Sequence, residues 1–115
     1  MRINRTGVIK MSENQIYFGT EIKVNVSIEP IGSYTMDDYD FQCEFYCYTN
    51  RRFVITKGNM IREDANNWLA LLKTELFGKG SLKCKITAYI PDADCDDGLR
   101  TEVLVLDTGI QIIGG

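Results

Sequence analysis

An acidic loop, residues 91–100 with the sequence PDADCDDGLR, is the stretch whose residue types and spacing come nearest to a chemical site. Three aspartates alternate along it: Asp92, Asp94 and Asp96. Aspartates at this spacing supply the first three ligands of an EF-hand calcium loop. The pattern then fails, because Asp97 stands where the loop requires glycine and Val103 stands where it requires a bidentate glutamate. We therefore interpret the loop as a solvated turn between two strands and keep the three aspartates as a secondary calcium hypothesis.

Residues that would carry catalysis are scarce in the rest of the chain. The sequence contains no histidine, so the commonest general base and the Ser-His and Cys-His nucleophile pairs are absent. The acidic residues show no spacing that selects a catalytic pair. The stretch GKGS, residues 78–81, lacks the first glycine of a phosphate-binding loop. The absence of histidine and of a CxxC pair argues against zinc. We predict that the protein is not an enzyme and has no cofactor.

Composition narrows the class of protein and of partner. The chain has 115 residues and a net charge of −3, which favours one domain and gives no positive excess for nucleic acid. No apolar run approaches the length of a membrane span, and the first residues do not resemble a secretory signal. We expect the chain to fold in a cytoplasm with its four cysteines reduced. Three of these are predicted to be small buried apolar residues: Cys43, Cys47 and Cys84.

Most of the chain alternates apolar and polar residues with a period of two, as half-buried strands do. The pattern predicts strands within residues 21–29, 41–48, 53–56, 67–73, 82–90, 101–107 and 109–113. Pro91 is expected to end one of them, because proline cannot donate to a strand ladder. With no convincing amphipathic helix, the pattern predicts an all-β protein. Its expected fold is an immunoglobulin-like antiparallel β-sandwich of about six to eight short strands, spanning residues 21–115.

Two groups of residues are predicted to contact partners. Residues 1–20 are polar except at a few points, namely Ile9, Met11, Ile16, Tyr17 and Phe18. They form either an extra edge strand or frayed leader, or an arm that docks on another subunit and can be deleted without loss of the fold. The second group consists of aromatics expected to face outward, Tyr46, Tyr48 and Tyr89, together with Trp68, whose facing is open. These form an interface, a carbohydrate platform, or ordinary cross-strand packing.

The strand-and-turn pattern of residues 21–112 resembles that of a known protein family. Short sequence stretches within it carry the resemblance, among them MDDYDF, GKGSLKCK and PDADCDDGLRTEV. The stretch resembles small immunoglobulin-like β-sandwich virion proteins of tailed phages and prophages of gut bacteria. It is also similar to the N-terminal module of phage baseplate upper proteins. The resemblance implies a structural role in a head fibre, head decoration, tail or baseplate, in several copies, and it carries no catalytic motif.

These observations together predict a non-enzymatic structural protein of a phage virion, made in the cytoplasm of the bacterial host. Its expected partners are other virion proteins and further copies of itself, with no nucleic acid and no membrane. The alternative is a carbohydrate-binding or adhesion module that stacks a surface glycan on Tyr46, Tyr48, Tyr89 or Trp68. A third reading is an adhesion domain stabilised by calcium at Asp92, Asp94 and Asp96.

Overall fold

A computed structural model describes residues 15–48 and 51–114, and this part of the chain contains eight β-strands, two short 3₁₀ turns and no α-helix. The strands are β1 (Gln15–Tyr17), β2 (Glu21–Ser27), β3 (Asp40–Tyr46), β4 (Arg52–Thr56), β5 (Ile61–Asp64), β6 (Asn67–Lys73), β7 (Gly80–Pro91) and β8 (Leu99–Ile113). The 3₁₀ turns are η1 (Lys57–Asn59) and η2 (Thr74–Leu76). None of the described residues forms a helix that could cross a membrane. The all-β prediction is confirmed.

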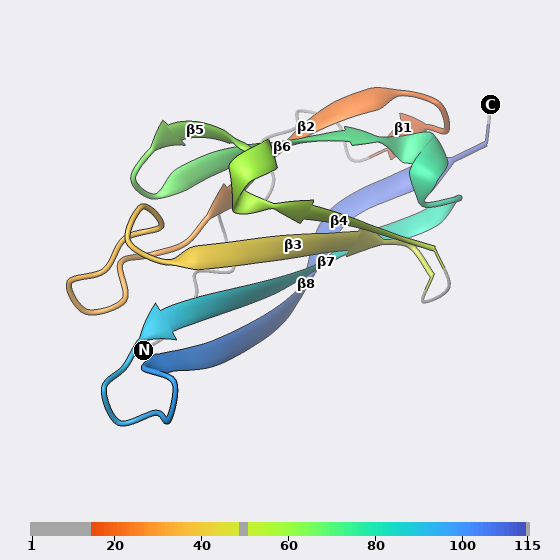
Figure 1. Cartoon of the computed structure of the whole chain (residues 1–115). Coiled ribbons are helices and arrows are strands. Elements are labelled where there is room, and N and C mark those ends of the chain that lie inside the picture. Colours follow the sequence, from red (N-terminus) through yellow and green to blue (C-terminus); the bar gives the residue numbers. More distant parts are fainter. Residues whose placement is uncertain (1–14, 49–50, 115) are drawn as a thin grey trace.

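The strands form two sheets that pack as a sandwich (Figure 1). One sheet has the order β1-β8-β7-β3-β4 and the other has the order β2-β6-β5. An immunoglobulin sandwich places its second, fourth and fifth strands in one sheet and its third, sixth and seventh in the other. Here β2, β5 and β6 form the sheet that corresponds to the second, fourth and fifth immunoglobulin strands. The other sheet contains β3, β7 and β8, which correspond to the third, sixth and seventh strands, and β4 is added beside β3. The immunoglobulin-like arrangement is therefore confirmed; β1 departs from a purely antiparallel ladder because it pairs with β8 in parallel.

The core lies between the two sheets, where the inward residues of each alternating strand meet. Along β7 every second side chain is buried, and the three fully buried phenylalanines are Phe41, Phe45 and Phe77. Phe41 of β3 meets the indole of Trp68 of β6 edge to face at 5.6 Å, which joins the sheets directly. Each such aliphatic or aromatic side chain contributes about 1.5–3 kcal/mol by leaving water.

The alternation pattern predicted the number and length of the strands incorrectly at two places. Residues 101–107 and 109–113 were expected as separate strands, but they belong to the 15-residue strand β8. The chain passes Gly109 at φ 78° without leaving the sheet, since glycine tolerates that conformation. Residues 61–64, which lie outside the predicted strands, form β5 against β6. The predicted strand at residues 67–73 and the end of the strand at Pro91 are confirmed.

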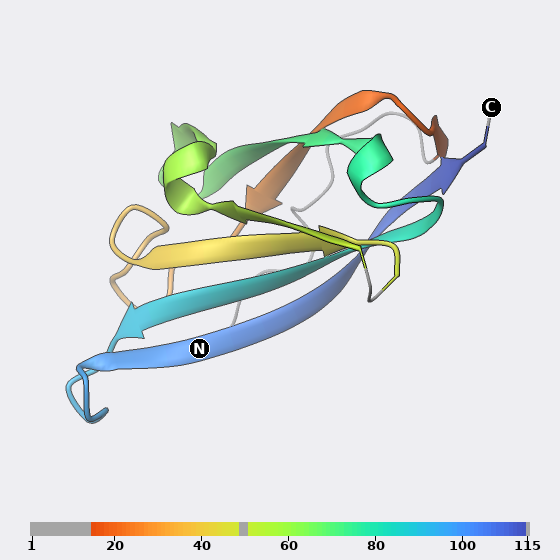
Figure 2. The ribbon, with the colours of Figure 1, turned by 45° about the vertical axis from the view of Figure 1, so that its right-hand side comes forward.

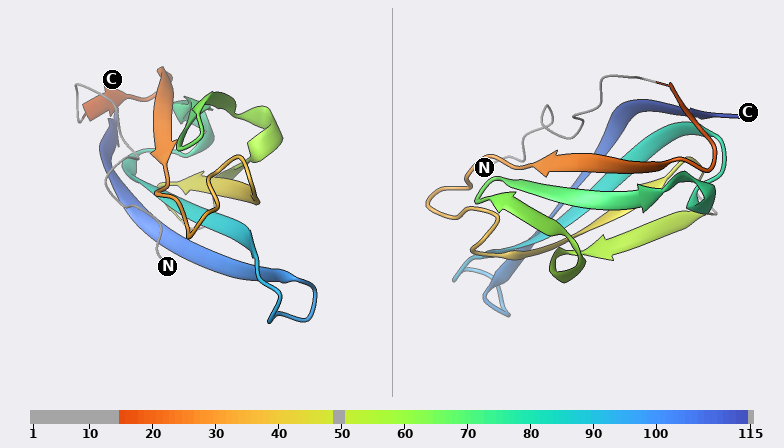
Figure 3. Two further views of the ribbon diagram at one scale, coloured as in Figure 1. Left: turned by 90° about the vertical axis from the view of Figure 1, so that its left-hand side faces the viewer. Right: turned by 90° about the horizontal axis from the view of Figure 1, so that it is seen from above.

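The long hairpin of β7 and β8 gives the molecule two distinct ends (Figure 2). The acidic loop that closes this hairpin projects beyond the three-stranded sheet, and the views in Figure 3 agree on this. At the opposite end of the molecule, the last residues of β8 pair with β1, close to the C-terminal end of the described residues.

Candidate binding surface

The acidic loop is a hydrogen-bonded turn in which its aspartates serve the backbone. Asp92 Oδ1 accepts the N–H of Asp94 at 3.0 Å, and Asp97 Oδ1 accepts the N–H of Leu99 at 3.1 Å. The guanidinium of Arg100 forms an ion pair with the other oxygen of Asp92. The pKa of Asp92 lies below its ordinary value, mainly because its carboxylate accepts the Asp94 N–H and to a smaller extent because of Arg100. The carboxylates of Asp92 and Asp97 are therefore paired with groups of the same loop.

The three alternating aspartates are not brought together as a ligand set. Among the described residues, which include the whole acidic loop, no group of three acidic, cysteine or histidine side chains is placed to hold a metal ion. Asp92 already accepts from the Asp94 N–H and from Arg100, so a calcium ion at this carboxylate would compete with the Arg100 ion pair.

Two of the four aromatics predicted as contact residues have little accessible area, one expected to face outward and one, Trp68, whose facing was left open. Trp68 is 9% exposed and lies in the core, and its ring faces the ammonium of Lys57 at 5.3 Å. Tyr46 is 8% exposed, because the guanidinium of Arg52 covers its ring at 4.3 Å. Tyr89 is half-buried beside Asp40. Stacking on a sugar needs an open ring face, and these residues do not form such a platform.

The exposed aromatics gather instead at one end of the sandwich. In the part of the chain that the structure describes, the strongly exposed aromatic side chains are Tyr17 (59%), Phe18 (41%) and Tyr48 (61%). The ring of Tyr48 lies against Gly80, whose Cβ, if present, would be 3.3 Å from the tyrosine hydroxyl oxygen. Gly80 pairs with Ile112 of β8, and Tyr17 pairs with the next residue, Ile113. The last residues of β8 therefore bring the three rings to the same end.

Basic and aliphatic side chains complete this surface. The ammonium of Lys79 lies 5.8 Å from the ring centroid of Phe18. Leu76 in η2 is 40% exposed, and Arg51 ties η2 to the β3–β4 turn by donating to the carbonyl of Glu75 at 3.2 Å. We call this surface, made of Tyr17, Phe18, Tyr48, Leu76 and Lys79, the aromatic end. Ile9 and Met11, predicted as contact residues, lie outside the described residues, and Ile16 is 6% exposed and belongs to the core.

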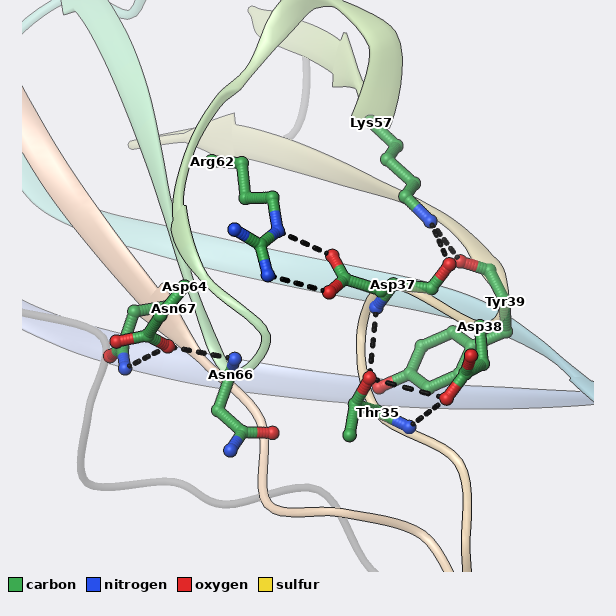
Figure 4. Close-up of polar contacts among 9 residues, drawn as sticks. All are labelled: Thr35, Asp37, Asp38, Tyr39, Lys57, Arg62, Asp64, Asn66 and Asn67. Carbon is green, nitrogen blue, oxygen red and sulfur yellow. Dashed lines mark hydrogen bonds and ion pairs between the residues drawn. The ribbon is translucent and has the colours of Figure 1, made fainter.

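The richest polar network fixes the loop between β2 and β3 and offers no free catalytic group (Figure 4). Arg62 of β5 holds the carboxylate of Asp37 through two hydrogen bonds of 2.8 Å. This contact lowers the pKa of Asp37 and raises that of Arg62. Lys57 donates to the carbonyls of Asp37 and Tyr39 at 3.3 and 2.8 Å. The network clamps the loop onto β5 and η1, and the sequence did not reveal it because its members are far apart along the chain.

Neighbouring polar residues form local turns of the same kind, as Figure 4 also shows. Asp64 accepts from the backbone of Asn66 and from the side chain of Asn67, and these bonds lower its pKa. Asp38 accepts from the backbone N–H of Thr35 at 2.8 Å. Each of these carboxylates is occupied with shaping a turn, which is the usual role of Asp and Asn in loops.

A hollow of about 450 Å³ lies over the β2–β6 pair. Its lining comes from Glu21, Ile22, Lys23, Leu71, Leu72 and Lys73. Glu21 stands opposite Lys73 in the ladder, and Lys23 stands opposite Leu71, so opposite charges and one exposed leucine share the rim. Its lining contains no histidine, cysteine or hydroxyl group that could act as a nucleophile or base.

The three cysteines predicted to be buried apolar residues are indeed buried, and Cys95 is half-buried. Burial raises the pKa of Cys47, and the thiol of Cys43 is the main cause of the raised pKa of Cys84. Thiols held in their protonated form in a core are poor nucleophiles.

Comparison of the chain with models of protein families, with curated proteins and with solved structures finds no significant match.

Proposed function

We propose that the protein is a non-enzymatic structural component of a phage virion and that it binds a neighbouring virion protein, or another copy of itself, through the aromatic end. The observation that carries the binding role is the gathering of the exposed aromatics Tyr17, Phe18 and Tyr48 at one end of the sandwich. The virion setting rests on the sequence resemblance alone.

Physical reasons favour a protein partner for this surface. Tyrosine and phenylalanine are enriched in protein interfaces, because they bury a large apolar area with few rotatable bonds. Here one face of each of two rings is already occupied, Tyr48 by Gly80 and Phe18 by the ammonium of Lys79. Rings supported in this way are preorganised for contact at the remaining face and edge.

A partner for this end is expected to present apolar and acidic groups. Lys79 lies over the ring of Phe18, and the guanidinium of Arg51 lies near Gly78 and donates to Glu75, so both cations lie at the junction of β7, η2 and the β3–β4 turn. An acidic rim on the partner would complement these charges and set the orientation of binding.

The test is quantitative mass spectrometry of purified phage particles from the source, with copy number measured relative to the major capsid protein. Tens to hundreds of copies would indicate a head or fibre component, and about a dozen would indicate tail or baseplate. Absence of the protein from the particle would refute the virion proposal.

Variants then test the surface within the same particles. Tyr17→Ala with Tyr48→Ala should reduce incorporation at least tenfold, as loss of interface aromatics does. The matched control is Val54→Ala, an exposed apolar residue of β4 outside the aromatic end, which should be incorporated normally. Equal incorporation of both variants would refute the role of the aromatic end. Binding of the purified chain to a glycan array, lost in the tyrosine variant, would favour a carbohydrate instead.

A further inference from the structure

The outer face of the five-stranded sheet, which is turned away from the three-stranded sheet, has exposed apolar side chains on two of its strands. Val103 and Val105 of β8 are 53% and 54% exposed, and Val54 of β4 is 44% exposed. Figure 2 shows β4, β3, β7 and β8 side by side in this sheet. Because large apolar side chains exposed on one face mark contact sites, this face is a candidate for an interface.

The two strands between these valines are charged, and their charges are ordered by strand. β7 presents Lys83 and Lys85 on the outer face, whereas β3 presents Asp40 and Glu44. Neither lysine forms an ion pair with another residue that the structure describes. A basic strand therefore lies directly beside an acidic one.

The strand registers place the outward side chains of this face in four rows. Read from β4 through β3 and β7 to β8, the rows are Arg52, Tyr46, Lys83 and Asp107; Val54, Glu44, Lys85 and Val105; Thr56, Gln42, Thr87 and Val103; and, without a β4 member, Asp40, Tyr89 and Thr101. Three basic and three acidic side chains occur in these rows, so the face is neutral although the whole chain has a net charge of −3.

We propose that this face packs against the same face of a second copy of the chain, about a two-fold axis that passes between β3 and β7 at the centre of the four rows. Such an axis places β7 of each copy over β3 of the other, and β8 over β4. Lys83 then faces Asp40 of the second copy, and Val103 faces its Val54. No two like charges of the rows stand opposite each other in this arrangement, so the face is complementary to itself.

The size of the face agrees with a dimer. Residues 99–107 of β8 are about 30 Å long at about 3.3 Å per residue, and four strands spaced about 4.8 Å apart are roughly 19 Å wide. Side chains stand up from this area, so its accessible surface approaches the roughly 800 Å² that each partner buries in a standard interface. Sheets that pack face to face keep their strands within about 30° of each other, and a two-fold axis normal to the face allows this.

The chemistry of the face is less suited to other partners. Nucleic acid requires a positive excess, which a neutral face does not provide. A sugar requires an open aromatic ring, but Arg52 covers the ring of Tyr46, and Tyr89 is half-buried. The exposed valines favour contact with another protein surface, because β-branched side chains have little rotamer freedom to lose on binding.

Analytical ultracentrifugation of the full chain tests the proposal. At about 100 µM the wild type should sediment as a dimer, with twice the chain mass of 13.1 kDa. Val103→Asp should raise the Kd of the dimer at least tenfold, because it buries a carboxylate against an apolar side chain of the second copy. Leu71→Asp is the matched control, at a leucine that is 50% exposed on the outer face of the other sheet, and it should leave the Kd unchanged. Circular dichroism checks that each variant is folded.

A charge exchange tests the position of the axis. Lys83 stands opposite Tyr46 and Asp40 stands opposite Tyr89, so the two charges are roughly 20 Å apart within one chain. Lys83→Glu and Asp40→Lys should each raise the Kd at least tenfold, because each places like charges opposite each other between copies. The double variant should return to within about threefold of the wild-type Kd, since the exchanged charges attract again across the interface.

Three results would overturn the proposal. The first is a wild-type chain that is monomeric at this concentration. The second is an equal loss of the dimer in Leu71→Asp, or a double charge variant that does not recover. The third is a dimer that dissociates when Tyr17 and Tyr48 are changed to alanine but persists in Val103→Asp, because the aromatic end would then hold the second copy.

These results are independent of the proposed function. The wild-type mass and the charge exchange remain informative even where Val103→Asp fails to fold. The aromatic end lies beyond the four rows, so a monomeric chain could still bind a virion protein there. Val54→Ala keeps its position in the face apolar, so it remains a suitable control for incorporation into particles.

Discussion

Replacing the buried hydroxyl of Thr108 tests how β8 stays continuous. Thr108 is fully buried, and its hydroxyl donates to the carbonyl of Leu82 at 2.7 Å and accepts the N–H of Ile110 at 3.2 Å. These contacts lie where the β7–β8 register shifts, between Ser81 and Lys83. The hydroxyl therefore replaces backbone partners that the bulge removes, and it lets β8 continue to the residues that hold β1.

The variant Thr108→Val keeps the shape of the side chain and removes the hydroxyl. It leaves a buried carbonyl and a buried N–H without this partner, and each unpaired group costs about 1–3 kcal/mol. We expect a loss of about 2–4 kcal/mol in the free energy of unfolding. Thr108→Ser is the matched control, because it keeps the hydroxyl and loses one buried methyl, at a cost of about 1 kcal/mol.

Urea unfolding followed by fluorescence measures both variants, because Trp68 is the single tryptophan and lies in the core. The slope of the unfolding free energy against urea should stay constant, and the valine variant should have the lower midpoint. In thermal unfolding the valine variant should melt roughly 8–15 °C below wild type and the serine variant roughly 4 °C below. A valine variant at least as stable as the serine variant would refute the assigned role of the hydroxyl.

Three further predictions concern the charged loops and the thiols. Calcium at about 1 mM should change the melting temperature by less than about 1 °C relative to chelator, because Asp92 is already paired; a rise of several degrees would restore the calcium hypothesis. Arg62 holds the pKa of Asp37 below its ordinary value of 3.8, so their contact stabilises the fold above that pH and is lost as the pH falls through the folded-state pKa. The fall in urea midpoint between about pH 5 and pH 2 should therefore be smaller in Arg62→Gln, and an equal fall would count against the pair. A thiol reagent should label Cys95 before the three buried cysteines, as mass spectrometry after partial labelling would show; simultaneous labelling would contradict the packing.

The alternating strands were predictable because their periodicity reflects which face meets the core. Residues 82–90 alternate without a break, and each apolar member of that run is buried in β7. The end of β8 was harder to predict, since Thr108 and Gly109 have the composition of a turn. Only the hydroxyl contact to Leu82 across the bulge shows why the strand continues. Local sequence does not encode such a long-range contact.

The surface was predicted less well than the core, for a physical reason. Alternation assigns Tyr46 to the outer face, but Arg52 on the neighbouring strand covers its ring. Trp68 carries no facing signal, because its strand is apolar on both sides. Tyr17, Phe18 and Tyr48 were among the predicted contact residues and are exposed, and their proximity depends on the pairing of β1 with the end of β8. Strand pairing over such a separation is not visible in the sequence.

The burial of Ile16 decides how the N-terminal segment has to be tested. Ile16 is 6% exposed and packs in the core, and its strand β1 also presents Tyr17 and Phe18 to solvent. Deleting residues 1–18 would therefore remove a core isoleucine, at a cost of about 2–5 kcal/mol, together with two residues of the aromatic end. A truncated chain that failed to assemble would not distinguish a lost contact from a lost fold. Point changes at Tyr17 and Tyr48 leave Ile16 in place, so they test binding at the aromatic end without removing a core side chain.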